Sequence, residues 1–131
     1  DLIVSQSTLE HVPASQAGSI MKSLARLVRP GGWMYHYIHL EDHRDFVNDP
    51  FGFLGAGDDY VEGQADVRGN RLRASEWMLI LDELKEFKWE SYPHAIRSDV
   101  ALPSPLADKY LTYALDDLRT SHLTVKGHRV S

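Results

Sequence analysis

DLIVSQSTLEHV, residues 1–12, is the stretch that decides the fold. Leu2 to Val4 form a short, continuous apolar run, which is typical of a strand covered on both faces in a parallel sheet. The polar residues that follow end this run and lead into a helix. The helix is indicated by apolar residues that recur with a 3.6-residue period, namely Ala17, Ile20, Met21, Leu24 and Val28.

The sequence after this helix predicts a second strand beside the first. Pro30, Gly31 and Gly32 stop the helix, and residues 33–40 are aromatic and β-prone. A strand, a helix and a strand with short connections form a β-α-β unit. We therefore expect two parallel strands joined by a right-handed crossover.

The rest of the chain continues this alternation after a long interruption. No period survives over residues 41–73, and so long a loop in a compact domain is usually functional or mobile. Four further elements are predicted: a helix over 75–87, a strand over 89–96, a helix over 104–118 and an antiparallel strand over 121–126. Pro93 indicates a bulge or an edge position in its strand. The order β-α-β-loop-α-β-α-β predicts an α/β fold, with residues 1–131 as a single domain.

Composition excludes several classes of function. The net charge is −5 over 131 residues and the pI is about 5.7, which argues against broad binding to nucleic acid or anionic membranes. The chain has no cysteine, so disulfides, thiol nucleophiles and thiolate metal sites are excluded. No stretch approaches the length of a transmembrane helix, and we see no signal peptide. We therefore expect a cytoplasmic location by default.

Several segments occur in an order that is specific as a series. DLIVSQSTLEHV is followed by a helix, then by LARLVRPGG and a strand. This series resembles the second half of class I S-adenosylmethionine-dependent methyltransferases, in which a "DLI" strand, an "LEHV" turn, a helix and an "L-x-P-G-G" turn succeed one another. YHYIHLEDHRD, NRLRASEW and DDLRTSHLTV are similar to later segments of a subgroup associated with glycan and surface-polysaccharide biosynthesis. The resemblance implies a partial Rossmann-like sheet and methyl transfer to a sugar or glycan-linked acceptor.

The chain departs from that family at the cofactor motif. The family binds S-adenosylmethionine with a glycine-rich turn after its first strand and an acidic residue at the end of its second. Neither is recognisable in this sequence. FGFLGAG at 51–57 has another spacing, follows no apolar strand and opens no helix, so we interpret it as a flexible loop. We expect weak or absent cofactor binding by the isolated chain.

The turn after the first strand holds the predicted cofactor and catalytic residues. In open α/β sheets, ligands lie beyond the carboxyl ends of the strands. The resemblance implies that Ser5, Gln6 and Ser7 line this crevice near the methionine end of the cofactor. His11 could act as the general base on a substrate hydroxyl, because the pKa of histidine suits neutral pH. Alternatively, Glu10 and His11 only orient the turn and the helix by hydrogen bonds.

A second set of candidates follows the second strand. His39, Asp42 and His43 could line a substrate pocket at its carboxyl end. Alternatively, these three are ordinary polar loop residues. His36, His39, Asp42 and His43 also have the side chains of a metal site, but His36 and His39 are three apart in a strand and point to opposite faces, so they could converge only if the strand ended between them, and we predict no metal. Arg71 precedes a helix and could clamp a phosphate or carboxylate. It could equally be a surface cation that tethers the long loop.

Two functions from different classes remain open. The chain could be the C-terminal portion of a methyltransferase, inactive until a cofactor-binding half is supplied in cis or by a partner. It could instead be a non-catalytic interaction module that forms a homodimer. In that reading the bare strand Asp1–Val4 pairs with its own copy, because an exposed apolar edge strand is normally covered.

Overall fold

The computed structural model describes residues 1–57, 60 and 62–131. Its strands are β1 (Leu2–Gln6), β2 (Trp33–His39), β3 (Phe87–Ile96) and β4 (Thr120–Arg129). Its α-helices are α1 (Ala14–Leu27), α2 (Ala65–Arg68), α3 (Ala74–Asp82) and α4 (Leu115–Arg119). Short 3-10 turns cover Leu9–His11, Gly52–Leu54, Glu62–Gln64 and Asp108–Tyr110. The predicted α/β class is confirmed.

The four strands form one mixed sheet in the order β1-β2-β4-β3. β1 and β2 are parallel, as the β-α-β prediction requires, and β4 runs antiparallel to both β2 and β3. The predicted antiparallel final strand is thus confirmed, and it lies inside the sheet. Pro93 lies in β3, which is an edge strand, where the missing N–H of proline is tolerated.

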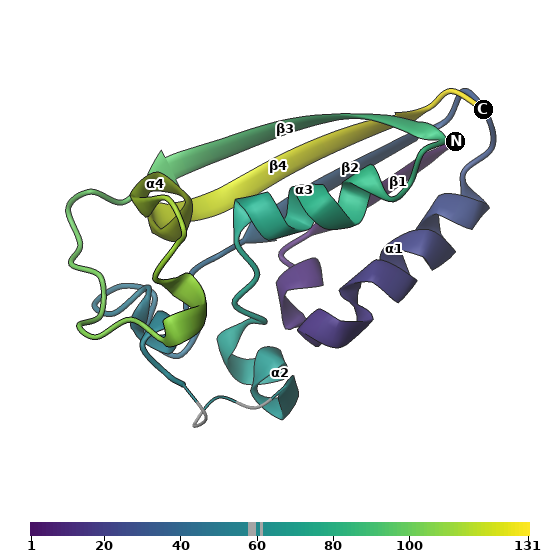
Figure 1. Ribbon diagram of the computed structural model, residues 1–131. Helices are drawn as coiled ribbons and strands as arrows, with labels where there is room; N and C mark the ends of the chain where they lie inside the picture. The colour runs from purple at the N-terminus through teal and green to yellow at the C-terminus, as the bar shows by residue number, and fades with distance from the viewer. Residues whose placement is uncertain (58–59, 61) are drawn as a thin grey trace.

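Both long helices cover the same face of the sheet (Figure 1). α1 buries Ala17, Met21 and Ala25, and α3 buries Trp77 and Leu81 against the strands. The strands supply every second side chain to this layer, as expected for a pleated sheet with one buried face. Their fully enclosed apolar members are Met34, Ile38, Leu123 and Val125.

The opposite face of the sheet is not covered by any described helix. Its cross-strand pairs alternate with the buried ones and include Leu2 with Trp33 and Val4 with Tyr35. These side chains are exposed, Leu2 by 63% and Val4 by 58%. The prediction that β1 is covered on both faces therefore holds for one face only, where Ile3 packs against the core.

The long segment between β2 and α3 is better ordered than its composition indicated. FGFLGAG contributes Phe51, Phe53 and Leu54 to a second apolar cluster, so the interpretation as a flexible loop was wrong for these residues. The cluster also contains Tyr110 and Leu118 from the segment before β4. Asp58, Asp59 and Val61 lie outside the described residues.

The predicted helix over 104–118 was wrong. The structure has only a 3-10 turn at Asp108–Tyr110 and the five-residue helix α4 there. Leu111 and Leu115, which fall on the predicted apolar face, are exposed by 63% and 62%. Tyr110 and Leu118 are both buried in the second cluster although no continuous helix joins them, so tertiary packing outweighs the helical period.

Two smaller expectations also change. The helix predicted over 75–87 begins at Ala74 and ends at Asp82, and Phe87 opens β3. Its N-cap is Arg73, whose backbone N–H donates to the Glu76 carboxylate at 3.1 Å.

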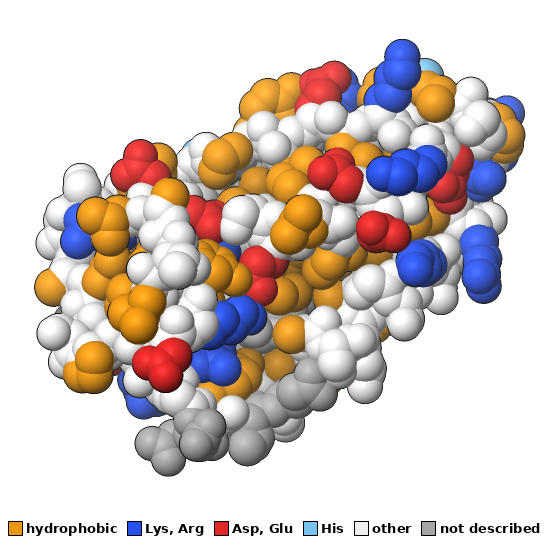
Figure 2. Space-filling model, in the orientation of Figure 1, with side chains coloured by type: hydrophobic (Ala, Val, Ile, Leu, Met, Phe, Trp, Pro, Cys, Tyr) orange, Lys and Arg blue, Asp and Glu red, His pale blue; other side chains and the backbone are white. Residues whose placement is uncertain are grey.

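On the face shown in Figure 2, charged and hydrophobic side chains are intermingled. No described helix combines the length and the apolar character needed to cross a membrane.

Candidate functional site

The cofactor residues proposed from the sequence end β1 and point in different directions. Ser5 lies on the helix-covered face, where its hydroxyl is 2.7 Å from His36 Nδ1. Gln6 is exposed on the open face. Ser7 turns the chain with a φ of 52°, and its N–H donates to the Tyr37 carbonyl at 2.9 Å. Of the three, Gln6 and Ser7 remain accessible to a ligand, whereas Ser5 partners a buried histidine.

His11 ends the 3-10 turn that follows β1, and its ring is fixed on two sides. Its Nδ1 lies 2.9 Å from the backbone carbonyl of Asp66. Because a carbonyl only accepts hydrogen bonds, Nδ1 carries the proton and Nε2 keeps its lone pair. The ring of His43 packs edge-on against His11, with centroids 4.7 Å apart. The structure therefore presents Nε2 of His11 as the basic nitrogen of the turn.

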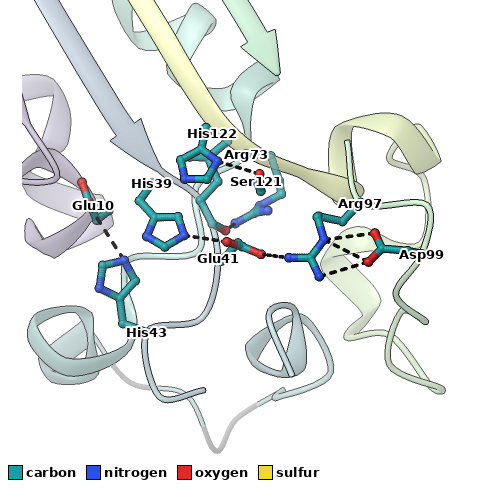
Figure 3. A network of polar contacts seen from close by, with 10 residues as sticks. Glu10, His39, Glu41, His43, Arg73, Arg97, Asp99, Ser121 and His122 are labelled. Atoms are coloured by element: carbon teal, nitrogen blue, oxygen red, sulfur yellow. Dashed lines mark hydrogen bonds and ion pairs between the residues drawn. The ribbon is translucent and has the colours of Figure 1, made fainter. Parts of the chain in front are cut away.

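A cluster of histidine and carboxylate side chains lies beyond the carboxyl ends of β1 and β2 (Figure 3). His39 Nε2 is 2.7 Å from Glu41 Oε1, and the ring of His122 stacks on His39 at 4.6 Å. His43 Nε2 is 3.8 Å from Glu10 Oε1. The predicted partners His39 and His43 are thus close, with ring centroids 4.6 Å apart.

Asp42 and Glu41, which flank the cluster, both have arginine partners. Asp42 is fully buried and is held by Arg68, with Nη2 at 2.6 Å and Nε at 3.3 Å. Glu41 receives Arg97 Nη1 at 2.9 Å. Asp42 was a predicted substrate residue, but it is enclosed and its carboxylate binds Arg68. The ion pair between Asp42 and Arg68 therefore holds the loop after β2 against α2.

Burial controls the protonation of this cluster. Loss of solvent raises the pKa of Glu10, and neighbouring backbone N–H groups and histidines only partly oppose the rise. Burial, helped by the positive charges that His39 and His11 carry when protonated, lowers the pKa of His43 to about 4. Burial followed by the charge of His39 lowers the pKa of His122. His43 and His122 are therefore mostly neutral near pH 7, and each keeps a nitrogen lone pair that can bind an electrophile.

Arg71 lines a small gap together with Glu10, His39 and Glu41, but its guanidinium has another task. Its guanidinium donates to the carbonyls of Phe53, at 3.1 Å, and Ala56. It also stacks over the Tyr60 ring at 3.8 Å. These contacts match the alternative in which Arg71 tethers the long loop. A hollow lined by Gly55, Gly57, Arg71 and Lys109 leaves part of this region open to solvent.

Sequence reasoning missed three members of the cluster. His122 was not among the predicted site residues, but β4 pairs with β2 and sets His122 opposite His39. Glu41 was passed over beside Asp42, and Glu10 was considered only as part of a turn. The alternation of polar and apolar residues in β4 was visible, but the register that joins it to β2 was not.

The faces assigned to the strand histidines are confirmed. His36 is fully buried on the helix-covered face, whereas His39 lies on the opposite face with His122. Among the described residues, the groups with metal-ligand spacing are Glu10 with His39 and His43, and His39 with Glu41 and His122. Neither group includes His36.

No protein-family model matches the chain, and no curated protein matches it significantly.

Proposed function

We propose that this chain forms the C-terminal part of a class I S-adenosylmethionine-dependent methyltransferase. The observation that carries the proposal is the parallel unit β1-α1-β2 followed by an antiparallel last strand, with titratable side chains gathered beyond the carboxyl ends of β1 and β2. Ligands of open α/β sheets bind at that edge. This topology supports the resemblance of DLIVSQSTLEHV and LARLVRPGG to the family, and that resemblance supplies the activity.

In this proposal, the turn after β1 binds the methionine end of the cofactor and positions the acceptor. Gln6 and Ser7 face the cofactor, and His11 takes the proton from the acceptor hydroxyl through Nε2. A sulfonium is already an activated methyl donor, so alignment of donor and acceptor supplies much of the rate. The acceptor is a sugar or glycan-linked hydroxyl, a choice that rests on the resemblance alone.

The open face of the sheet supports a role within a larger assembly. Leu2, Val4, Trp33 and Tyr35 form an exposed apolar and aromatic surface across β1 and β2. Surfaces of this kind mark contacts with other protein segments. We propose that a glycine-rich cofactor-binding half covers this face, in cis or from a partner, and that the isolated chain binds S-adenosylmethionine weakly.

Two measurements test the proposal. Calorimetric titration of this chain with S-adenosylmethionine should give weak or no binding, and tight binding would contradict the dependence on another half. Methyl transfer to sugar acceptors is then measured with the cofactor-binding half present. His11→Ala should lower turnover by about 10²–10⁴-fold, the usual contribution of a general base. Lys22→Ala, on the exposed side of α1, is the control and should retain activity.

A specific observation favours a second candidate function, a self-associating interaction module. β1 is an edge strand whose outer side has no partner in the described chain, and it carries two exposed apolar side chains. Such an edge invites pairing with a second copy across a two-fold axis. Light scattering should then show a dimer that Val4→Lys dissociates. A monomer at every concentration would exclude this candidate.

A further inference from the structure

Glu10 is a buried carboxylate without the partners that such a group needs. Only 1% of its surface is exposed, and neither carboxylate oxygen has a hydrogen bond of ordinary geometry in the described part of the chain, although the backbone N–H groups of Glu10 and His39 lie close enough to oppose part of the rise in its pKa. Burying an unpaired charge costs a free energy of roughly several kcal/mol, unless a cation or hydrogen bonds compensate the charge. Glu10 lies directly after β1, at the carboxyl ends of the strands, so its missing partners belong to the candidate site.

The two carboxylates near Glu10 in the cluster each have an arginine that neutralises their charge. Asp42 is neutralised by Arg68, and Glu41 by Arg97. Glu10 pairs with no Lys or Arg side chain among the described residues, and its nearest basic group is His43 Nε2 at 3.8 Å. That nitrogen is itself buried and without a hydrogen-bond partner in the described chain. Two unsatisfied electron-pair donors therefore face each other across a short gap.

His39 completes a three-sided arrangement around this gap. One ligand atom each from Glu10, His39 and His43 lie within 4.8 Å of one another. Two ligands bound at about 2.0–2.1 Å to one tetrahedral ion are about 3.3 Å apart. The 3.8 Å between Glu10 and His43 thus exceeds the bonded spacing by a few tenths of an ångström. Side-chain rotations would have to bring the three ligand atoms, which lie within 4.8 Å of one another, to this spacing.

We propose that Glu10, His39 and His43 bind one divalent transition-metal ion. Two imidazoles and one carboxylate are a donor set for Zn²⁺, Fe²⁺, Co²⁺ or Mn²⁺. The ion supplies the positive charge that Glu10 lacks and uses the free nitrogen of His43. The site is reachable, because the side chains of His39 and His43 are 14% and 19% exposed.

The hydrogen bonds around the two groups favour Glu10, His39 and His43 over the group of His39, Glu41 and His122. His39 Nε2 is engaged by Glu41 Oε1, so Nδ1 is the nitrogen offered to the ion. A carboxylate on the second nitrogen of a metal-binding histidine fixes its tautomer and raises its basicity. In the overlapping group of His39, Glu41 and His122, both Glu41 oxygens already have partners, His39 and Arg97. That group therefore has no unsatisfied carboxylate to attract an ion.

Three protein ligands leave at least one coordination position of the ion open. Such positions take water or an oxygen ligand, and a bound hydroxyl loses its proton more readily. The ion would thereby activate an acceptor hydroxyl next to His11. This last step rests on the proposed methyl transfer, whereas binding of the ion rests on Glu10, His39 and His43 alone.

The test uses metal binding, so its result is independent of any activity. The chain is stripped with a chelator, dialysed and titrated with Co²⁺ and Zn²⁺ by calorimetry and visible absorption. We expect one ion per chain, a visible Co²⁺ band that Zn²⁺ abolishes, and a thermal midpoint that rises with ion concentration. Glu10→Gln, which keeps the side-chain shape, should weaken binding by at least about 100-fold, beyond the usual effect of outer-shell changes.

His122→Gln is the matched control, since His122 belongs only to the overlapping group and should retain the affinity. Folding of each variant is checked by circular dichroism, and the metal-free Glu10→Gln protein should be at least as stable as the wild type. Failure of the folded wild type to bind either ion would overturn the proposal. So would loss of binding in His122→Gln with retention in Glu10→Gln, since the ion would then lie in the other group.

Discussion

The imidazole rings of His39 and His122 stack face to face, with centroids 4.6 Å apart and planes inclined by 4°. The two residues are cross-strand partners where β2 ends and β4 begins. Insertion of the last strand beside β2 therefore builds one wall of the polar cluster. Because burial and the charge of His39 lower the pKa of His122, the stack forms without two facing positive charges near neutral pH.

His36 should make the stability of the chain depend on pH. It is fully buried beside Ser5, and burial lowers its pKa from 6.5 to about 4. Below pH 6.5 the unfolded chain binds a proton that the folded chain does not, so stability falls as the pH drops from 6.5 to 4. The loss at pH 4 should reach about 3 kcal/mol, since each pKa unit is worth about 1.4 kcal/mol.

Urea unfolding of wild type and His36→Gln between pH 4 and 8 checks this expectation. The other histidines titrate in both proteins, so the difference between the two curves isolates His36. The difference in the free energy of unfolding between the two proteins should be constant above pH 6.5. Below pH 6.5 it should become smaller as the pH falls, because only the wild type loses the contribution of His36. A difference that is independent of pH would show that His36 does not titrate as its burial requires.

The fold could be predicted where side-chain periodicity and packing agree. The β-α-β unit was recognisable because α1 keeps its apolar residues on one face and Pro30-Gly31-Gly32 ends it. The segment over 104–118 has a similar period, yet Leu111 and Leu115 are exposed. Its conformation depends on Phe51 and Phe53, which lie more than fifty residues earlier, and no local pattern reveals that contact.

The candidate site was predictable only in part, for a similar reason. Glu10, His11, His39 and His43 follow strand ends, and the rule for open sheets directed attention to those turns. His122 joins them only through the register of β4 on β2, which a single sequence does not specify. The unpaired state of Glu10 becomes visible only once Arg68 and Arg97 are seen to serve its neighbours.

Gly127 should be intolerant of any side chain. It pairs with Trp89 across β3 and β4, and a Cβ at this position would overlap the indole ring. Gly127→Ala must displace the ring or the strand, at a cost of about 1–3 kcal/mol. Gly18→Ala is the control, since a Cβ there meets nothing within 4 Å. It lies inside α1 and should stabilise the protein by up to about 1 kcal/mol.

Unfolding midpoints in urea compare the two alanine variants. The urea midpoint should fall below that of the wild type for Gly127→Ala and rise above it for Gly18→Ala. The dependence of the free energy of unfolding on urea concentration should be unchanged in both. Near-ultraviolet circular dichroism should report a changed Trp89 environment in Gly127→Ala only. Equal effects of the two substitutions would contradict the close packing of Trp89 on the β4 backbone.

Asp42 distinguishes a structural carboxylate from a ligand-binding one. It is fully buried, is held by Arg68 and also accepts the backbone N–H of Arg44 at 3.0 Å. Asp42→Asn leaves the guanidinium of Arg68 without a counter-charge, and breaking a buried pair in this way costs about 3–5 kcal/mol. Asp49→Asn removes an exposed partner of Arg44 and should change stability little. Urea unfolding measures both, and a stable Asp42→Asn protein that loses acceptor binding would restore Asp42 to the substrate pocket.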